Sequence, residues 1–315
     1  MIMKFKFLFI ISFPLALLVA CGGGTNQTID ETPTRGKIKI AVDESFQLLI
    51  DTELYTFQSL YKYADITPVY TSEEEVINSF MRDSIRTIVT TKTLTKEQET
   101  FFNQRQIIPR TTKIAYDAVT IIINKSNSDS LIRYTDIKKI FSGTSTLWKE
   151  INPKSKLEKI NVVFDNSKSS NTRYIREKFD ITTQYPDNFY ALNNNQEVIE
   201  YVERNKNALG IISVNWISDR DDSLSRGFLK KIQVCAISSP IAPDGPDFYK
   251  PYQGFIADNS YPFIRDVYMI CKETFSGLGS GFTSFVAGDQ GQRIVLKSGL
   301  VPATMPIRVI QIKKN

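Results

Sequence analysis

Strand-like and helix-like segments alternate along most of this chain. Residues 37–42 alternate polar and apolar side chains, as a strand does, whereas residues 46–61 place apolar side chains at helical spacing. Further strand-like segments follow at 86–89, 114–124, 161–164 and 208–214, and further helical segments start near 71 and 95 and span 173–179. Alternating strands and helices of this length form a mostly parallel sheet with helices on its faces. We therefore predict an α/β fold.

The first 35 residues lack this alternation. Two lysines precede an apolar run over residues 7–19, which is the charge order of a secretory signal and is too short for a stable membrane-spanning helix. The run ends at Ala20 and Cys21, which resembles the lipobox of bacterial lipoproteins, whose cysteine carries the lipid. We predict a signal peptide over residues 1–20, lipid attachment at Cys21 and a polar tether over residues 21–35. An ordinary signal peptide with an incidental cysteine is the alternative.

The composition excludes several classes of site. The chain has no histidine, which excludes Ser-His-Asp triads, Cys-His pairs and histidine-ligated metals. Its net charge of +5 comes from interspersed acids and bases, without the basic stripe of a nucleic-acid-binding protein. Cys235 and Cys271 lie in apolar segments, so we expect buried free thiols, with a disulfide as the alternative. We expect no cofactor, no metal and no nucleic-acid partner.

Three loops that follow predicted strands share one chemistry. They span residues 43–46, 90–92 and 167–172, and each carries hydroxyl side chains or opens a helix. In α/β folds ligands bind beyond the carboxyl ends of the strands, and the free N–H groups at a helix start favour an anion. We therefore predict an anion cleft, with ordinary helix caps as the alternative. The candidate ligand-binding residues are Asp43, Glu44, Ser45, Phe46, Thr90, Thr91, Lys92, Ser169, Ser170, Asn171, Thr172 and Arg173.

Several longer segments carry a family resemblance. The end of the chain, residues 281–302, looks like the closing helix pair and the "Gly, apolar, Val-Pro" finish of one receptor family. Framework segments of that family are matched at residues 208–214, 261–268 and 140–143 with Trp148. Over residues 36–309 the chain resembles the phosphate-binding solute receptors of ABC transporters, in a form similar to lipoproteins of the Bacteroidetes group.

The resemblance implies a two-lobed type 2 periplasmic-binding-protein (Venus-flytrap) fold with two hinge strands. The crossings between the lobes would fall near residues 117–120 and 237–243. One lobe would then comprise residues 36–117 and 241–315, and the other residues 118–240. An anion would be held between helix N-termini of the two lobes. No catalysis is implied, and we expect a monomer.

The family's ligand contacts transfer only in part. Ser45 and the amide of Phe46 match the end of the family's first loop, and Lys92 stands where related members have an arginine. Residues 169–172 stand where the family has Ser-Gly-Thr, and the arginine upstream of that motif is replaced by residues 164–165, Phe-Asp. Losing the glycine and the forked arginine changes both the approach of the backbone and the donor pair.

Selectivity for phosphate requires an acceptor as well as donors, because phosphate near neutral pH carries a proton and sulfate does not. The second-loop aspartate of the best-known members is missing here. The remaining candidate acceptors are Asp43, Glu44 and Asp165, with Asp43 the first choice, and Arg173 is the candidate replacement for the missing arginine. We therefore expect phosphate or arsenate to be preferred over sulfate.

These observations favour a periplasm-facing lipoprotein that binds phosphate, or a related oxyanion, and delivers it to an ABC permease. A receptor for another small solute and a ligand-free scaffold or adhesion lipoprotein are alternatives on the same fold. A surface hydrolase with Ser-Lys or paired-carboxylate chemistry, for example at Asp221 and Asp222, is a third class. Adjacent acids on solvent-facing turns explain such pairs better.

Overall fold

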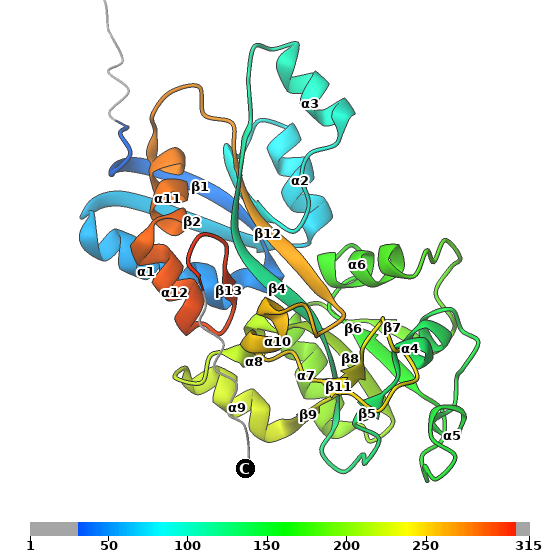
Figure 1. The fold of residues 1–315 in the computed structure, drawn as a ribbon. Helices are drawn as coiled ribbons and strands as arrows, with labels where there is room; N and C mark the ends of the chain where they lie inside the picture. Colours follow the sequence, from blue (N-terminus) through cyan, green and yellow to red (C-terminus); the bar gives the residue numbers. More distant parts are fainter. Residues whose placement is uncertain (1–30, 307–315) are drawn as a thin grey trace, which may run out of the picture. The chain divides into compact units, whose positions relative to one another are not determined.

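The computed structural model describes residues 31–306 (Figure 1). The predicted signal peptide, Cys21 and the predicted tether up to residue 30 lie outside the described residues. The strands are β1 (Arg35–Asp43), β2 (Tyr63–Thr71), β3 (Thr87–Thr90), β4 (Arg110–Asn124), β5 (Leu131–Ile132), β6 (Asn161–Phe164), β7 (Phe189–Ala191), β8 (Ala208–Ser213), β9 (Ile232–Val234), β10 (Ala236–Ser238), β11 (Phe248–Tyr249), β12 (Ile264–Cys271) and β13 (Val301–Pro302).

The helices cover the sheet that these strands build. They are a short 3-10 helix η1 (Glu44–Phe46), α1 (Gln47–Leu60), α2 (Glu73–Met81), α3 (Lys96–Asn103), α4 (Tyr134–Phe141), α5 (Trp148–Ile151), α6 (Ser170–Lys178), α7 (Asn195–Arg204), α8 (Asn215–Ser218), α9 (Ser223–Lys231), α10 (Gln253–Ala257), α11 (Leu278–Ala287) and α12 (Asp289–Lys297). The predicted start at Thr95 is confirmed, since Thr95 and Gln98 form a reciprocal capping box at α3.

The main sheet is mixed rather than mostly parallel. Within residues 31–306 its strand order is β2-β1-β3-β12-β4-β8-β6-β7, and β13 and β9 also pair with β4. β1 is parallel to β2 and β3, and β6 is parallel to β7 and β8, so each lobe has the predicted parallel core. At the junction, β4 and β12 run antiparallel to each other and to their other neighbours, which corrects the prediction there.

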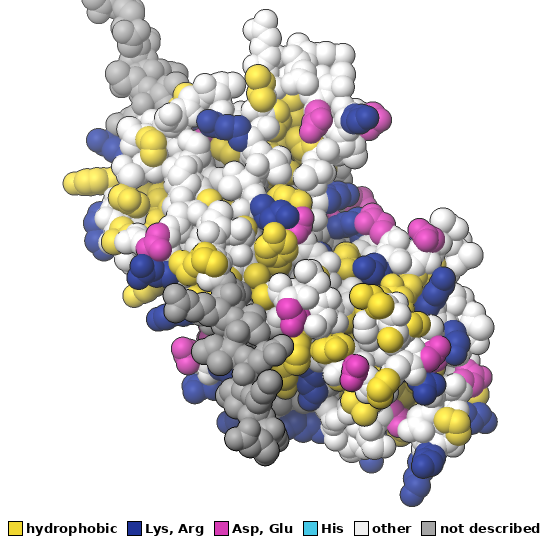
Figure 2. All heavy atoms as spheres, viewed as in Figure 1, with side chains coloured by type: hydrophobic (Ala, Val, Ile, Leu, Met, Phe, Trp, Pro, Cys, Tyr) yellow, Lys and Arg dark blue, Asp and Glu magenta, His cyan; other side chains and the backbone are white. Residues whose placement is uncertain are grey.

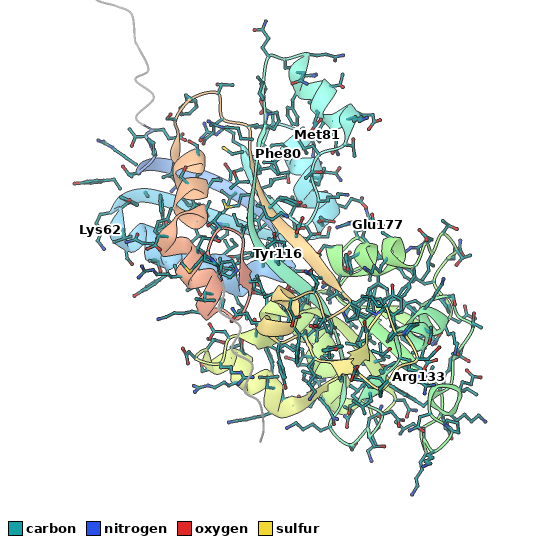
Figure 3. All side chains as sticks on the ribbon, in the orientation of Figure 1. Lys62, Phe80, Met81, Tyr116, Arg133 and Glu177 are labelled. Atoms are coloured by element: carbon teal, nitrogen blue, oxygen red, sulfur yellow. The ribbon has the colours of Figure 1, made fainter. Side chains whose placement is uncertain are left out.

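The two strands β4 and β12 connect the lobes. The first part of β4 pairs with β12, and residues 119–124 pair with β8 and β9 of the other lobe. Tyr116, labelled in Figure 3, lies on β4 just before this change of partner. The predicted crossing at residues 117–120 therefore lies on β4, and the predicted two-lobed fold with two hinge strands is confirmed.

The second predicted crossing, at residues 237–243, does not lie on a strand of the main sheet. This segment connects β10 to β11, and both strands belong to a small separate sheet that includes β5. Ser238 turns the chain locally, because its hydroxyl donates to the carbonyl of Pro243 at 2.6 Å. The chain returns to the main sheet at β12, where Ile264 pairs with Ala118.

The apolar core follows β4 through both lobes, and its residues from Ala118 to Ile123 are buried. A smaller cluster lies under α2 and α3, where the rings of Phe80 (labelled in Figure 3) and Phe102 meet edge to face at 5.2 Å. Cys235 and Cys271 are buried and free, as predicted.

The described surface has no single dominant charge on the face shown in Figure 2. Lys and Arg side chains lie there among Asp and Glu side chains rather than in a stripe. Among the helices of residues 31–306, none has the length and apolar character needed to cross a membrane.

A buried ion pair joins the hinge strands where they face each other. Asp117 on β4 and Arg265 on β12 are partners in the sheet register, and the Arg265 Nη2 atom lies 2.7 Å from Asp117 Oδ2. The side chains are 0% and 2% exposed, respectively. The hydroxyl of Ser213 on β8 also donates to Asp117 Oδ1 at 3.0 Å. The pair therefore links both hinge strands to the second lobe.

We predict that Asp117→Ala strongly destabilises the fold, because it leaves the Arg265 charge buried without a partner. Removing one member of a buried ion pair costs about 3–5 kcal/mol of unfolding free energy. Urea unfolding measures this, with Asp65→Ala as the matched control. Asp65 pairs with Lys37 at the surface, where both side chains are exposed, so the control should be unchanged. Equal effects in the two variants would show that the hinge pair has no special role.

Candidate functional site

Two of the predicted loops meet where the lobes touch. Ser45 lies directly after β1 and Ser170 is the first residue of α6, and their hydroxyl oxygens are 3.4 Å apart. Asn171 Nδ2 donates to Ser45 Oγ at 3.3 Å. All three residues are buried. Donors from both lobes therefore converge on one buried point at the start of a helix.

The predicted helix at 173–179 begins three residues earlier than expected, at Ser170. Ser169 caps it, because its hydroxyl accepts from the Thr172 amide at 3.3 Å. Ser169 is therefore the helix cap, and the Thr172 amide is the group that it caps. The shift places the amides of Ser170 and Asn171 in the first turn, where helical N–H groups lack helical acceptors.

Arg265 brings a positive charge to this point, although it is not among the residues predicted from the sequence. Its Nη1 donates to Ser170 Oγ at 3.0 Å, while Nε donates to Asp117 at 2.8 Å. Its guanidinium also lies over the ring of Phe46, 5.5 Å from the centroid. The available signal was an arginine that alternates with the apolar residues Val267 and Met269 along one face of a strand. We call Ser45, Ser170, Asn171 and Arg265 the Ser45–Ser170 cluster.

The three predicted acceptors border this cluster. Asp43 accepts from the Ser45 amide at 3.1 Å, and its Oδ2 has no hydrogen-bond partner. Burial, with the nearby charge of Glu73, raises the pKa of Asp43 to about 7. Asp165 accepts from Asn171 Nδ2 at 2.9 Å, and burial raises its pKa. Burial and the charge of Asp165 raise the pKa of Glu44 to about 8.

Two asparagines of the second lobe complete the contact and were also missed. Asn195, the first residue of α7, donates to Glu44 at 2.5 Å and accepts from the Ser213 amide at 3.0 Å. Asn215 Nδ2 donates to the carbonyl of Ser45 at 3.1 Å. Asn195 follows a run of asparagines that resembles an exposed loop, so its burial depends on contacts that the sequence does not display.

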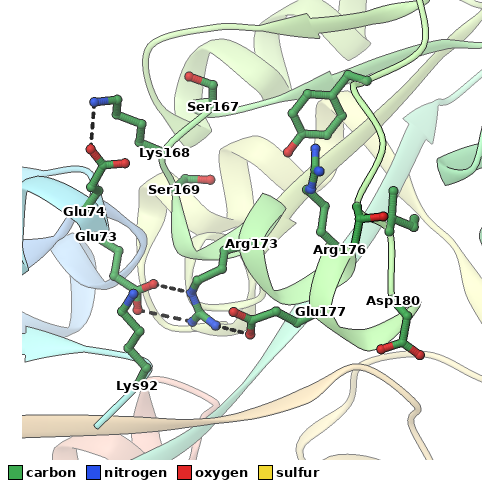
Figure 4. A pocket seen from close by; sticks show the side chains of 13 residues that line it. Glu73, Glu74, Lys92, Ser167, Lys168, Ser169, Arg173, Arg176, Glu177 and Asp180 are labelled. Carbon is green, nitrogen blue, oxygen red and sulfur yellow. Dashed lines mark hydrogen bonds and ion pairs between the residues drawn. The ribbon is translucent and has the colours of Figure 1, made fainter. Parts of the chain in front are cut away.

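The second loop is engaged by an internal carboxylate. Glu73, in the first turn of α2, accepts from Thr90 Oγ1, from the Thr91 amide and from Thr91 Oγ1 at 2.9, 2.9 and 2.6 Å. Arg173 donates to the same carboxylate from the other lobe, with Nε 2.5 Å from Glu73 Oε2 (Figure 4). Thr90, Thr91 and Arg173 are thus brought together around Glu73, apart from the Ser45–Ser170 cluster. We call these four residues the Glu73 cluster.

Within residues 31–306, the side chain of Lys92 forms no hydrogen bond to either cluster. It lines a cavity of about 670 Å³ together with Lys168 and Arg173 (Figure 4). Within residues 31–306 there is no group of acids, cysteines or histidines that could hold a metal ion.

We predict that Glu73→Gln weakens the fold at neutral pH. Burial acts to raise the pKa of Glu73, but Arg173 and the Thr91 donors outweigh it and hold the pKa at about 2. An acid whose pKa is lowered on folding stabilises the fold above its unfolded pKa, and this stabilisation is lost as the pH falls toward 2. At pH 7 the variant should therefore lose on the order of 3 kcal/mol of unfolding free energy.

Unfolding free energies measured from pH 7 down to pH 2 test this prediction. The difference in unfolding free energy between the wild type and the variant should become smaller as the pH falls. Glu74→Gln is the control, because Glu74 pairs with Lys168 where both side chains are at least half exposed. A gap that stays constant down to pH 2 would contradict the prediction.

Comparisons with known proteins agree with this architecture. A family model described as a PBP superfamily domain matches residues 28–290. The phosphate-binding protein PstS of Staphylococcus aureus (strain bovine RF122 / ET3-1) is 24% identical over 285 residues, covering 88% of this chain and 81% of the relative. PstS of Staphylococcus epidermidis is 23% identical over 284 residues, covering 88% of this chain and 82% of the relative.

A solved structure also shares the fold. A Clostridium perfringens protein with bound phosphate, assigned to the substrate-binding proteins of phosphate ABC transporters, matches with a TM-score of 0.72 and 20% identity, covering 85% of this chain and 100% of that chain. This likeness confirms the predicted two-lobed binding-protein architecture. Since the family model spans most of its residues, the chain belongs to the PBP superfamily.

Proposed function

We propose that this protein is an extracytoplasmic receptor that binds phosphate, or a closely related oxyanion, between its lobes and delivers it to an ABC permease. The observation that carries the proposal is the Ser45–Ser170 cluster. It places two hydroxyls, an amide and a guanidinium at the start of α6, buried between the lobes. The hydroxyls of Ser45 and Ser170 are close enough to donate to one oxygen of an anion.

The cluster provides the positive charge that the family's missing arginine would supply. Arg265 substitutes for it from β12, in place of Arg173, which is bonded to Glu73. Because Arg265 is also paired with Asp117 on the opposite hinge strand, a bound anion would contact the hinge directly. We propose that the first lobe ends at residue 117 and the second begins at residue 118. We also propose that the chain passes back to the first lobe at the start of β12, rather than between residues 240 and 241.

Asp43 is the acceptor that would distinguish phosphate from sulfate. In the ionised form of Asp43, the buried and unpartnered Oδ2 can accept a hydrogen bond from the protonated oxygen that phosphate retains near neutral pH. Sulfate has no such proton, and two acceptors forced together in a buried site are costly. The names of the relatives, which are phosphate-binding proteins, support the same ligand. A receptor of this kind needs no cofactor, and superfamily membership favours binding over catalysis.

Calorimetry on the chain without its predicted signal peptide, residues 1–20, tests the ligand. We expect phosphate to bind at least about tenfold more tightly than sulfate, the factor that one lost hydrogen bond to a charged group produces. Ser170→Asp should abolish binding, because it places a negative charge inside the cluster. Ser223→Asp is the matched control, since Ser223 is the exposed first residue of α9 and a negative residue at a helix start is favourable. Sulfate binding as tightly as phosphate, or full binding by Ser170→Asp, would refute the proposal.

We also propose that lipid on Cys21 holds the receptor at a membrane, facing the periplasm. The lipobox-like ending of the signal segment supports this assignment. Two or more acyl chains give stable anchoring, so the wild type should remain with membranes through high-salt washing. Cys21→Ser should accumulate as precursor or appear in the soluble fraction. Equal retention and processing of both proteins would contradict the anchor.

A further inference from the structure

A cavity of about 450 Å³ opens beside the Ser45–Ser170 cluster. Its lining includes Asp43, Glu44, Asp165, Ser169 and Trp216. This volume lies within the range of roughly 300–1,000 Å³ found for small-molecule sites, and it exceeds what a single tetrahedral anion fills. We call this cavity the acceptor pocket.

The acceptor pocket presents three carboxyl groups and, among its described lining residues, no lysine or arginine. Asp165 accepts a hydrogen bond from the Ser169 hydroxyl at 2.6 Å, and Glu44 accepts one from the side-chain amide of Asn195 at 2.5 Å. Both of these donors are neutral. The charge of Arg265 acts to lower the pKa of Asp43 and Asp165. The hydrogen-bond donors of Arg265, however, bond to Asp117 and Ser170. The lining therefore favours a positively charged donor in the cavity.

Trp216 gives a second, independent indication of a ligand. It lines the acceptor pocket and is only 3% exposed, yet its Nε1–H has no hydrogen-bond partner. Buried polar groups are rarely left unpaired, and an indole ring also attracts cations to its face. The Oδ2 atom of Asp43 is also unpaired, so two lining residues of the acceptor pocket each carry a buried polar atom without a hydrogen-bond partner.

Building on the proposed function, we propose that the preferred ligand is a zwitterionic phosphate ester or phosphonate with a primary amine. Its anionic group binds at the Ser45–Ser170 cluster, and its ammonium group enters the acceptor pocket. The ammonium group donates to Asp43 and Glu44, while an oxygen of the ligand accepts from Trp216. Ser169 and Asp165 line the pocket next to Ser170 and Asn171, so a short spacer between the two charges is sufficient.

The protonation of the acids agrees with this arrangement. Burial raises the pKa of Glu44 to about 8, with a contribution from the charge of Asp165. A cation within hydrogen-bond distance would favour the ionised form and offset the cost of burying it. Inorganic phosphate offers no such cation, whereas an aminoalkyl phosphate does.

A matched pair of ligands tests the inference by calorimetry on the full domain. Phosphoethanolamine carries an ammonium group where propyl phosphate carries a methyl group, and the two are otherwise alike. We expect phosphoethanolamine to bind at least about tenfold more tightly, the factor expected from one charge-assisted hydrogen bond. Glu44→Gln should reduce this ratio, whereas Glu74→Gln, an exposed acid outside the acceptor pocket, should retain it. Melting temperatures report whether each variant is folded.

Inorganic phosphate and glycerol phosphate in the same series separate the possible failures. If phosphate binds but the two matched esters bind equally, or if glycerol phosphate equals phosphoethanolamine, the amine inference is wrong and the proposed function stands. If phosphate and all the esters fail to bind, the proposed function fails together with the inference. The comparison on the wild type decides the matter even if Glu44→Gln does not fold.

Discussion

The ion pair between Asp117 and Arg265 is the interaction on which the rest of the structure depends. It lies where the two hinge strands face each other, and it is buried on all sides. A charge pair in such a place is a poor source of net stability, because desolvation offsets much of the attraction. The pair instead fixes the position of Arg265, whose guanidinium reaches Ser170 on the second lobe. The cation that would contact a ligand is thus part of the hinge itself.

The lobe interface contains two separate clusters of hydrogen-bond donors. In the Glu73 cluster, a carboxylate of the protein accepts from two threonines of the first lobe and from Arg173 of the second. In the Ser45–Ser170 cluster, the donors face each other and Arg265. The internal carboxylate of Glu73 holds the lobes together at one point, and we propose that the second cluster receives the solute. This division explains why only some of the loop residues expected from the sequence meet at one site.

Periodicity and capping predicted most of the fold, because those signals are local. The strand before Asp43 and the helix after Thr95 are examples. The position of Arg265 was not predictable, because the side on which a strand residue faces the cleft depends on pairing with β4, far away in the sequence. Glu73 looked like an ordinary acid of a first helical turn, and only its burial beside Thr91 reveals its role. The sheet that includes β10 was hidden for the same reason, since the apolar run at residues 232–237 does not reveal which sheet receives it.

A crystal structure of the mature protein grown with phosphate would test the central claim most directly. We expect the phosphorus atom between the lobes, with phosphoryl oxygens within hydrogen-bond distance of Ser45 Oγ, Ser170 Oγ and the guanidinium of Arg265. The carboxylate of Glu73 should remain bonded to Thr91 and Arg173. Phosphate bound instead at Thr90, Thr91 and Arg173, with Glu73 displaced, or phosphate found only outside the lobe interface, would contradict the assignment of the site.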